Sequence, residues 1–485
     1  MSLSKVANVV GLLSVLIGLA MGVTGLVALA YGDGDARAFF ISASVTFVVG
    51  WGVYLLTRFE EDVTTREGFA IVTMSWVAAA AFGGLPYLLS GVVATPVPAF
   101  FEAMSGFTTT GATVFSDIES LPRGILLWRS TTHWIGGMGI IVLVIAVLPY
   151  LGVGGMQLFQ AEVPGPTPER LRPRITQTAK LLWLVYFGLT ALCGLLYLLG
   201  GMTPFDAVNH AFSTLATGGF STKNSSMAGM SPFIQWVTIV FMYLAGVNYS
   251  LHFRAAAGRP VYFRDEEWRF FTAVILVAGV AVTLLNLLSG GGAGSGAAVR
   301  DGFFQVLAIT TTTGYVSADY EQWIPAARMV LFALFFVGGM AGSTSGGVKA
   351  LRVMLLLKAT ANELRRHLHP RAVLVVRVGS KPVKAEIAAR VVGFVIMYLM
   401  LCLAGALALS MTGIDTMTAI GGSIASVGNV GPAFAELGPT DNYGWMSEPG
   451  LAVLSFLMLV GRLEIYTVVL LFHPELWKQR GAFHR

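Results

Sequence analysis

The sequence predicts an all-α polytopic membrane protein. In this prediction, four repeats of helix, pore helix and helix surround one pore in pseudo-fourfold symmetry, and an extra helix pair precedes them. Three observations support it. The composition is strongly apolar, long apolar runs follow one another along the chain, and one short pattern ending in glycine occurs four times between those runs.

The composition suits a lipid environment. Hydrophobic residues make up 55% of the chain, charged residues 12%, and the mean hydropathy is +0.72. Soluble domains carry roughly 25% charged residues. The net charge of +5 is explained by basic loops, so we expect no nucleic-acid partner. The two cysteines, Cys193 and Cys402, lie in separate apolar runs and are expected to be packing residues without a disulfide.

Ten apolar runs approach the length of about 20 residues that crosses a bilayer. They cover residues 8–31, 38–57, 69–92, 125–150, 181–200, 233–252, 270–289, 327–348, 391–411 and 450–472. The repeated pattern lies between the members of the last four pairs, so the first pair is an addition to a fourfold core. The predicted units are residues 1–62 for the N-terminal pair and 63–160, 161–262, 263–375 and 376–485 for pore repeats 1 to 4.

The basic residues predict the orientation. With ten spans and a cytoplasmic N-terminus, 24 of the 31 Lys and Arg residues face the cytoplasm, six face outward, and Arg462 lies within a span. This asymmetry follows the positive-inside rule and places both termini in the cytoplasm, with the four repeated patterns on the outer side.

Three connecting segments differ in composition. Residues 157–180 are proline-rich and basic and predict a cytoplasmic link, and residues 290–299 predict a flexible outer loop. Residues 349–390 have helical periodicity in their first half and suit a short hairpin around Gly379-Ser380 in their second. This piece is either a charged linker facing water or a docking surface for a cytoplasmic partner.

The repeated pattern occurs at residues 107–111, 215–219, 310–314 and 427–431, and each copy ends in glycine. Glycine adopts the left-handed or alternating torsions that aim successive carbonyls at one axis. Rings of such oxygens suit a dehydrated potassium ion. No carboxylate lies within the four copies, whereas a divalent-cation site uses charged oxygens. The second and fourth copies leave Gly218 and Gly428 open as alternative registers.

Acidic residues precede the four copies. Asp206, Asp301 and Asp415 lie near the expected starts of pore helices, where carboxylates favour the positive end of the helix dipole, and Glu102 lies upstream of the first copy. The carboxyl ends of these helices would then point toward the central cavity and favour a cation. Simple N-capping is an alternative role that is compatible with this one.

Residues 338–347 interrupt the inner helix of the third repeat with five glycines. Irregular backbone at membrane depth is tolerated only within protein or beside water. The segment is therefore either a mobile gate beneath the four copies or a packing kink.

Arg462 lies midway along the last apolar run. A charge at the bilayer centre costs about 2.5–3.5 kcal/mol on insertion scales, so Arg462 should face the bundle interior or a water cavity. We predict that it acts as a barrier near the ion path, with a buried structural ion pair as the alternative. Glu464 is two residues away and on a different helix face, so a direct pair is not expected.

These motifs resemble the Trk/Ktr/HKT superfamily of potassium transporters over nearly the whole chain. The most specific parts are the four glycine patterns, residues 342–347 and Gly461-Arg462-Leu463-Glu464. The extra N-terminal pair resembles the TrkH/TrkG branch. The resemblance implies a homodimer in which each protomer has its own pore. It also implies a cytoplasmic ring of TrkA-like nucleotide-binding regulators encoded elsewhere.

The resemblance assigns the selectivity filter residue by residue. The potassium-binding oxygens would come from Thr109, Thr110, Gly111, Thr217, Gly218, Gly219, Thr312, Thr313, Gly314, Asn429, Val430 and Gly431. The gate would comprise Gly342, Ser343, Thr344, Ser345, Gly346, Gly347 and Arg462. Glycine at position 111 fits potassium-selective members, whereas serine there is associated with sodium-preferring relatives. The fourth copy departs from the threonine-rich form and is followed by Pro432.

The function predicted from these features is potassium uptake across a bacterial inner membrane through a channel-like filter, gated by the glycine-rich loop and a cytoplasmic regulator. The alternative is symport of potassium with sodium or protons. No cofactor is expected in this chain, and a nucleotide is expected only on the regulator. An intramembrane enzyme using Ser343 or Ser345 would need a histidine or lysine base beside the serine, and the sequence does not require one.

Overall fold

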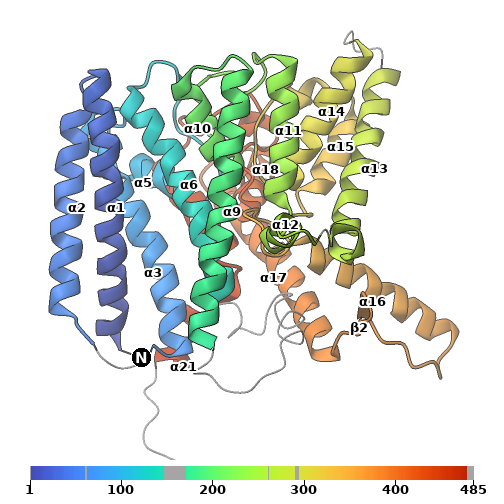
Figure 1. Cartoon of the computed structure of the whole chain (residues 1–485). Coiled ribbons are helices and arrows are strands. Elements are labelled where there is room, and N and C mark those ends of the chain that lie inside the picture. Colours follow the sequence, from blue (N-terminus) through green and yellow to red (C-terminus); the bar gives the residue numbers. More distant parts are fainter. Residues whose placement is uncertain (1, 60–62, 147–170, 260, 290–293, 478–485) are drawn as a thin grey trace, which may run out of the picture.

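The computed structural model describes residues 2–59, 63–146, 171–259, 261–289 and 294–477. Long helices stand side by side across the molecule (Figure 1). Within the described ranges, six helices are long and apolar enough to cross a membrane, and two bent helix pairs raise this number to eight. Large apolar side chains such as Val23, Leu184, Val277 and Leu403 are exposed on these helices, as a lipid-facing surface requires.

The N-terminal pair, α1 (Leu3–Tyr31) and α2 (Ala36–Leu56), lies at one side of the molecule (Figure 1, blue). Small residues let the two backbones approach closely, because a Cβ atom on Gly50 would lie 2.7 Å from the carbonyl oxygen of Gly11. Asp35 in the connecting turn accepts a hydrogen bond from the Ile125 N–H, 3.1 Å away, and so attaches the pair to the first unit.

Four units follow, each with an outer helix, a short pore helix and an inner helix. The first comprises α3 (Thr65–Gly83), α4 (Leu85–Leu89), α5 (Pro96–Phe107) and α6 (Arg123–Ala146). The second comprises α9 (Leu171–Leu199), α10 (Pro204–Leu215), α11 (Pro232–Gly246) and α12 (Tyr249–Ala256). The third comprises α13 (Glu266–Leu288), α14 (Ser295–Thr310), α15 (Pro325–Leu334) and α16 (Ala350–Leu368). The fourth comprises α17 (Ala385–Ser410), α18 (Thr416–Gly428), α19 (Glu448–Arg462), α20 (Tyr466–Val469) and α21 (Pro474–Trp477). Short 3-10 turns occur at Tyr262–Arg264, Tyr320–Gln322, Ala435–Leu437 and Leu470–Phe472.

The starts of the pore helices agree only in part with the prediction. Asp415 caps α18 by accepting hydrogen bonds from the N–H groups of Met417 and Thr418, and Asp206 lies in the first turn of α10. Asp301 was expected near the start of its helix, but it lies inside α14, which begins at Ser295. The predicted outer loop 290–299 is therefore helical from Ser295, because Ala297 and Ala298 favour helix. Residues 290–293 lie outside the described ranges.

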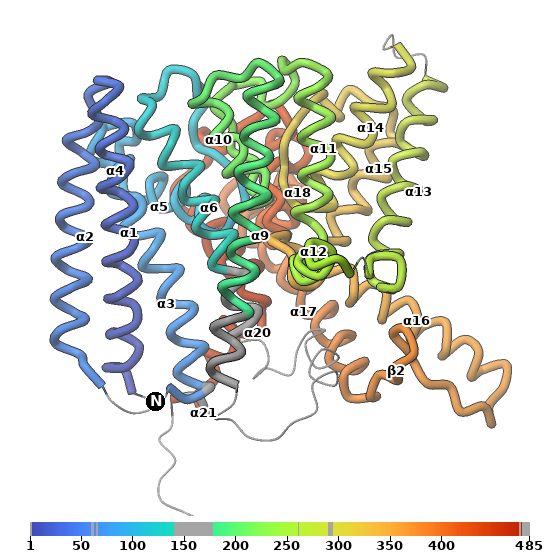
Figure 2. Tube along the Cα trace, in the orientation of Figure 1, coloured from blue at the N-terminus to red at the C-terminus, as the bar shows by residue number. Residues whose placement is uncertain are grey.

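Three inner helices are broken among the described residues. The break in the third unit falls at residues 338–347 as predicted, whereas the inner helices of the second and fourth units were expected to be continuous spans. Spans 233–252 and 450–472 are each a pair of helices, bent by 102° between α11 and α12 and by 109° after α19. Span 327–348 is helical only in α15. At the first break Asn248 caps α12 through the Ser250 N–H, and at the second Glu464 and Ile465 have positive φ. Figure 2 shows the first of these bends, where α12 turns away from α11 near the middle of the molecule.

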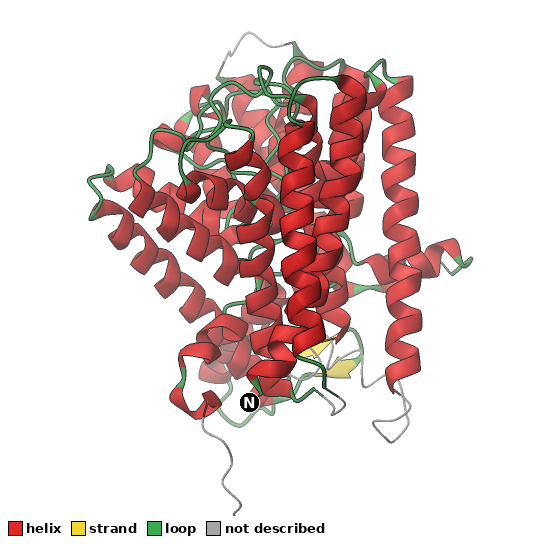
Figure 3. Ribbon diagram, turned by 90° about the vertical axis from the view of Figure 1, so that its left-hand side faces the viewer, coloured by secondary structure: helices red, strands yellow, loops and turns green. Residues whose placement is uncertain are grey.

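The predicted cytoplasmic piece, residues 349–390, matches its prediction of a helix followed by a hairpin. Residues 350–368 form α16, and strands β1 (Arg377–Val378) and β2 (Lys381–Pro382) form an antiparallel hairpin in which Val378 faces Lys381. The strands lie at the end of the molecule that carries the N-terminus (Figure 3). Helix α9 already begins at Leu171, within the predicted link 157–180, and residues 157–170 lie outside the described ranges.

Candidate functional site

The four glycine patterns form turns of the same backbone shape. In each turn, the glycine and the residue two positions before it both have positive φ. The φ values are 51° and 82° for Thr109 and Gly111, 54° and 81° for Thr217 and Gly219, 57° and 73° for Thr312 and Gly314, and 55° and 94° for Asn429 and Gly431. This recurrence aligns residues 217–219 and 429–431 with the other two copies. Gly218 and Gly428 are therefore not equivalents of the final glycine.

The four turns meet in a closed ring, here called the turn ring: residues 109–111, 217–219, 312–314 and 429–431. A Cβ atom on Gly111 would lie 2.0 Å from the Gly218 carbonyl oxygen, and one on Gly219 would lie 2.0 Å from that of Thr313. A Cβ atom on Gly314 would lie 2.0 Å from the Val430 carbonyl oxygen, and one on Gly431 would lie 2.5 Å from the Thr110 carbonyl oxygen, which closes the ring. Each glycine thus makes room for the middle carbonyl of the next unit.

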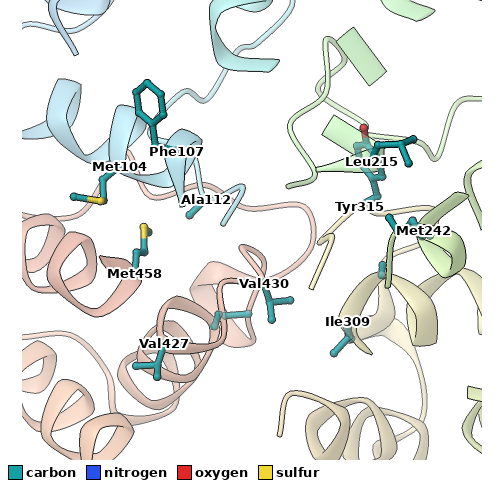
Figure 4. Close-up of a cluster of buried hydrophobic side chains, with 14 of the residues drawn as sticks. Met104, Phe107, Ala112, Leu215, Met242, Ile309, Tyr315, Val427, Val430 and Met458 are labelled. Carbon is teal, nitrogen blue, oxygen red and sulfur yellow. The ribbon is translucent and has the colours of Figure 1, made fainter. Parts of the chain in front are cut away.

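Apolar side chains from all four units pack around the turn ring. Figure 4 shows Ala112 and Phe107 from the first unit, Leu215 from the second, Ile309 from the third and Val430 from the fourth. These residues are at most 3% exposed. Such packing holds the turns rigidly in register.

Threonine hydroxyls support the turns from within. Thr108 Oγ1 lies 2.8 Å from Thr110 Oγ1 in the first unit, and Thr311 Oγ1 lies 2.7 Å from Thr313 Oγ1 in the third. The fourth turn has Asn429 instead, whose Nδ2 donates to Thr110 Oγ1 at 3.0 Å and to the Met458 carbonyl at 2.9 Å. Asn429 therefore links the fourth turn to the first, which explains how the atypical fourth copy fits the ring.

The pore helices point their carboxyl ends at the turn ring. Helices α5, α10, α14 and α18 end at Phe107, Leu215, Thr310 and Gly428, directly before the four turns. The carboxyl end of a helix carries about half a negative charge. Four such ends converge here, so the electrostatics of this region favour a cation.

The glycine-rich segment, residues 338–347, packs directly against the turn ring. The Gly346 N–H donates to Thr312 Oγ1 at 2.7 Å. Thr344 Oγ1 donates to the Leu215 carbonyl at 3.0 Å, and a Cβ atom on Gly346 would lie 2.6 Å from the Gly428 carbonyl oxygen. The segment therefore contacts the second, third and fourth units.

Hydrogen bonds hold the first half of this segment and the start of the helix that follows it. The Met340 N–H donates to the Gly246 carbonyl at 2.9 Å, and the Gly342 carbonyl accepts from the Tyr249 N–H at 3.1 Å. Glu267 of α13 accepts from the N–H groups of Ala341 at 2.7 Å and Leu351 at 3.2 Å. Sequence reasoning missed Glu267, and the only signal for it was a carboxylate at the start of an apolar run.

Arg462 lies beside the same segment. Its Nη1 donates to the Thr344 carbonyl at 2.8 Å, and its side chain is almost fully buried. Its Nε and Nη2 atoms have no hydrogen-bond partner in the part of the chain that the structure describes. The structure thus brings Arg462 together with the predicted gate residues.

Glu464 forms an ion pair with Arg352 and not with Arg462. Its carboxylate contacts the guanidinium of Arg352 in α16, and that guanidinium also stacks on the Phe394 ring, 3.9 Å from its centroid. The expectation that Arg462 and Glu464 do not pair directly is therefore confirmed. The pair joins the bend after α19 to the helix that follows the glycine-rich segment.

A second buried ion pair also escaped sequence reasoning. Arg129 Nε in α6 lies 2.8 Å from Glu102 Oε1 in α5, and both side chains are at most 1% exposed. The sequence placed Arg129 among the outer cations and Glu102 among the acids before the turns. Opposite charges in two neighbouring apolar segments were the available signal.

Three histidines of the interior have hydrogen-bond partners. His133, His210 and His252 each contact a hydroxyl group, from Ser213, Ser221 and Tyr262. No group of three potential metal ligands occurs among the described residues. The Ser343 hydroxyl donates to the Met340 carbonyl, and the Ser345 hydroxyl has no hydrogen-bond partner among the described residues. Lys349 Nζ donates to the backbone carbonyl of Ser345 and not to its hydroxyl.

Known proteins resemble this chain over nearly its full length. The family model TrkH, a cation transport protein, matches residues 36–479. The Trk system potassium uptake protein TrkH of Salmonella typhimurium is 40% identical over 485 residues, covering 99% of this chain and 100% of the relative. TrkG of Escherichia coli K12 is 34% identical, covering 98% of each chain. The crystal structure of the potassium transporter TrkH from Vibrio parahaemolyticus has a TM-score of 0.91 and 36% identity, covering 99% of this chain and 100% of that one. The chain therefore belongs to the TrkH family of cation transport proteins.

Proposed function

We propose that this chain takes up potassium ions across a bacterial inner membrane through the turn ring. The closed ring of four quasi-equivalent turns is the observation that supports this function. The relatives named as potassium uptake proteins support the choice of ion. The ion-binding oxygens are those of the residues in the turn ring, including the atypical Asn429 and Val430.

The chemistry of the ring suits a monovalent cation that has lost its water. Carbonyl oxygens replace the hydration shell, and the four helix carboxyl ends add negative potential without a fixed carboxylate. A membrane potential of 100 mV contributes about 2.3 kcal/mol per charge to cation entry. No covalent step is needed.

We also propose that residues 342–347 and Arg462 form the gate. In the described arrangement the segment contacts three units directly beneath the ring, and Arg462 adds a positive charge beside it. Displacement of the segment would open the path. Regulation would come from a cytoplasmic ring of TrkA-like nucleotide-binding proteins docking on residues 349–390, in a homodimer whose protomers each have a pore and cytoplasmic termini.

The decisive measurement is rubidium uptake into liposomes that contain the purified chain. Uptake should be driven by an inside-negative potential, inhibited by potassium and resistant to sodium. Absence of uptake, both with and without an added regulator, would contradict the proposal. Reversal potentials in mixed gradients distinguish the symport alternative, because a coupled carrier shifts them with the sodium or proton gradient.

A further inference from the structure

Glu102 and Arg129 form a charged connection between two of the four turns. Glu102 Oε1 accepts from Thr113 Oγ1 at 3.0 Å, and Oε2 accepts from the Val114 N–H at 3.0 Å. Thr113 and Val114 follow the first turn after one intervening residue, Ala112. The Glu102 carboxylate thus holds the extended segment that follows the first turn.

Arg129 holds the segment that follows the second turn, which begins at Phe220. Its Nη1 donates to the Ser221 carbonyl at 3.2 Å, and its guanidinium lies 4.0 Å from the centroid of the Phe220 ring. His133, one helical turn further along α6, stacks on the same ring at 4.0 Å. Phe220, the residue after Gly219, is therefore clamped between two side chains of the first unit.

The other units have a weaker version of this arrangement. In the second unit Thr222 donates to Asp206 at 2.6 Å, and in the third Ser317 donates to Asp301 at 3.1 Å. In both units a carboxylate of the pore helix therefore holds the segment that follows the turn. Both aspartates are only partly buried. Among the described residues, neither pairs with a cation that contacts the next unit, as Glu102 does through Arg129. The first unit alone, among the described residues, joins its turn to the next through a fully buried ion pair.

We propose that the Glu102–Arg129 pair is a positioning element for ion selectivity. It sets the spacing between the first and second turns and hence the position of the Gly218 carbonyl, beside which Gly111 packs. A planar guanidinium suits this role because it can pair with a carboxylate, donate to a carbonyl and stack on an aromatic ring at once. The inference rests on the proposed function, since selectivity has meaning only for a conducting ring.

The test is the double variant Glu102→Met/Arg129→Met. Apolar replacement of a whole buried ion pair is often neutral for stability, whereas removal of one partner leaves a buried charge. We expect the double variant to be folded and to conduct, with the preference for potassium over sodium reduced roughly tenfold or more by the displaced oxygens. Arg129→Lys, which keeps the charge but loses the planar stack, should show a smaller loss in the same direction.

Lys5→Met/Glu67→Gln is the matched control, because it removes another whole buried pair, which joins α1 to the first turn of α3 outside the turn ring. It should leave the potassium-to-sodium ratio unchanged. A folded double variant with wild-type selectivity would overturn the inference while leaving the proposed function intact. If the double variant does not fold, wild-type selectivity in Arg129→Lys overturns it instead. Absence of potassium-selective flux in the wild type would contradict the proposed function itself.

Discussion

Gly346 donates its backbone N–H to Thr312 Oγ1 across 2.7 Å, and so joins the glycine-rich segment to the turn ring by a fully buried hydrogen bond. The segment and the third turn are therefore coupled. Any movement of the segment must break this bond or move Thr312, which has a left-handed backbone conformation.

Thr312→Val should weaken this coupling. It leaves the Gly346 N–H buried without its acceptor, at a cost of about 1–3 kcal/mol. If the segment closes the path, regulator-independent flux should rise about 5-fold or more, since a coupling of 1 kcal/mol corresponds to about 5-fold. Rubidium flux without regulator measures this. Thr312→Ser keeps the hydroxyl and serves as the control, and equal flux in both variants would refute the coupling.

Arg462→Met should increase conductance. Among the described residues the buried guanidinium has one hydrogen bond, to the Thr344 carbonyl, so its positive charge is poorly neutralised by these neighbours. A tenfold rise in flux corresponds to a barrier lowered by about 1.4 kcal/mol. Arg462→Lys retains the charge and should stay near the wild-type flux. Unchanged flux and voltage dependence in a folded Arg462→Met protein would reject the barrier role.

Gly219→Ala should abolish selective flux. Its φ of 81° strains any L-residue, and the added Cβ would lie 2.0 Å from the Thr313 carbonyl oxygen. Gly413→Ala is the matched control, because Gly413 has φ of 87° but no atom within 4 Å of an added Cβ. The control should lose about 1–2 kcal/mol of folding stability from backbone strain and keep its flux. Equal flux in the two variants would show that Gly219 is not in the conducting ring.

Asp35→Asn should stabilise the protein at neutral pH. Burial raises the pKa of the Asp35 carboxyl above its ordinary value, so the folded state binds the proton more tightly than the unfolded state. Wild-type stability therefore rises as the pH falls toward that pKa, and the advantage of Asp35→Asn should disappear at low pH. Unfolding temperatures at several pH values test this, with the exposed Glu448→Gln as the control. If Asp35→Asn still raised the unfolding temperature at low pH, the raised pKa of Asp35 would not be the cause of the stabilisation.

Much of the architecture follows from apolar run length and from the position of glycine. The helix at 350–368 and the hairpin around Gly379 are local features, and both match their predictions. The breaks after Gly246 and Arg462 were missed because both flanking stretches are apolar. Each bend depends on local hydrogen bonds and positive φ values that hydropathy does not report.

The sequence by itself determined the helical membrane architecture, the four glycine turns and the buried arginine, because run length, glycine and a charge among apolar residues are local signals. Only the tertiary structure decided the register of the second and fourth turns, the order in which each glycine meets the next unit's carbonyl, and the partners of Glu102 and Glu464. These depend on contacts between residues that are from 27 to more than 300 positions apart, as in the link from Asn429 to Thr110. Such contacts exist only once the four units have closed around a common axis.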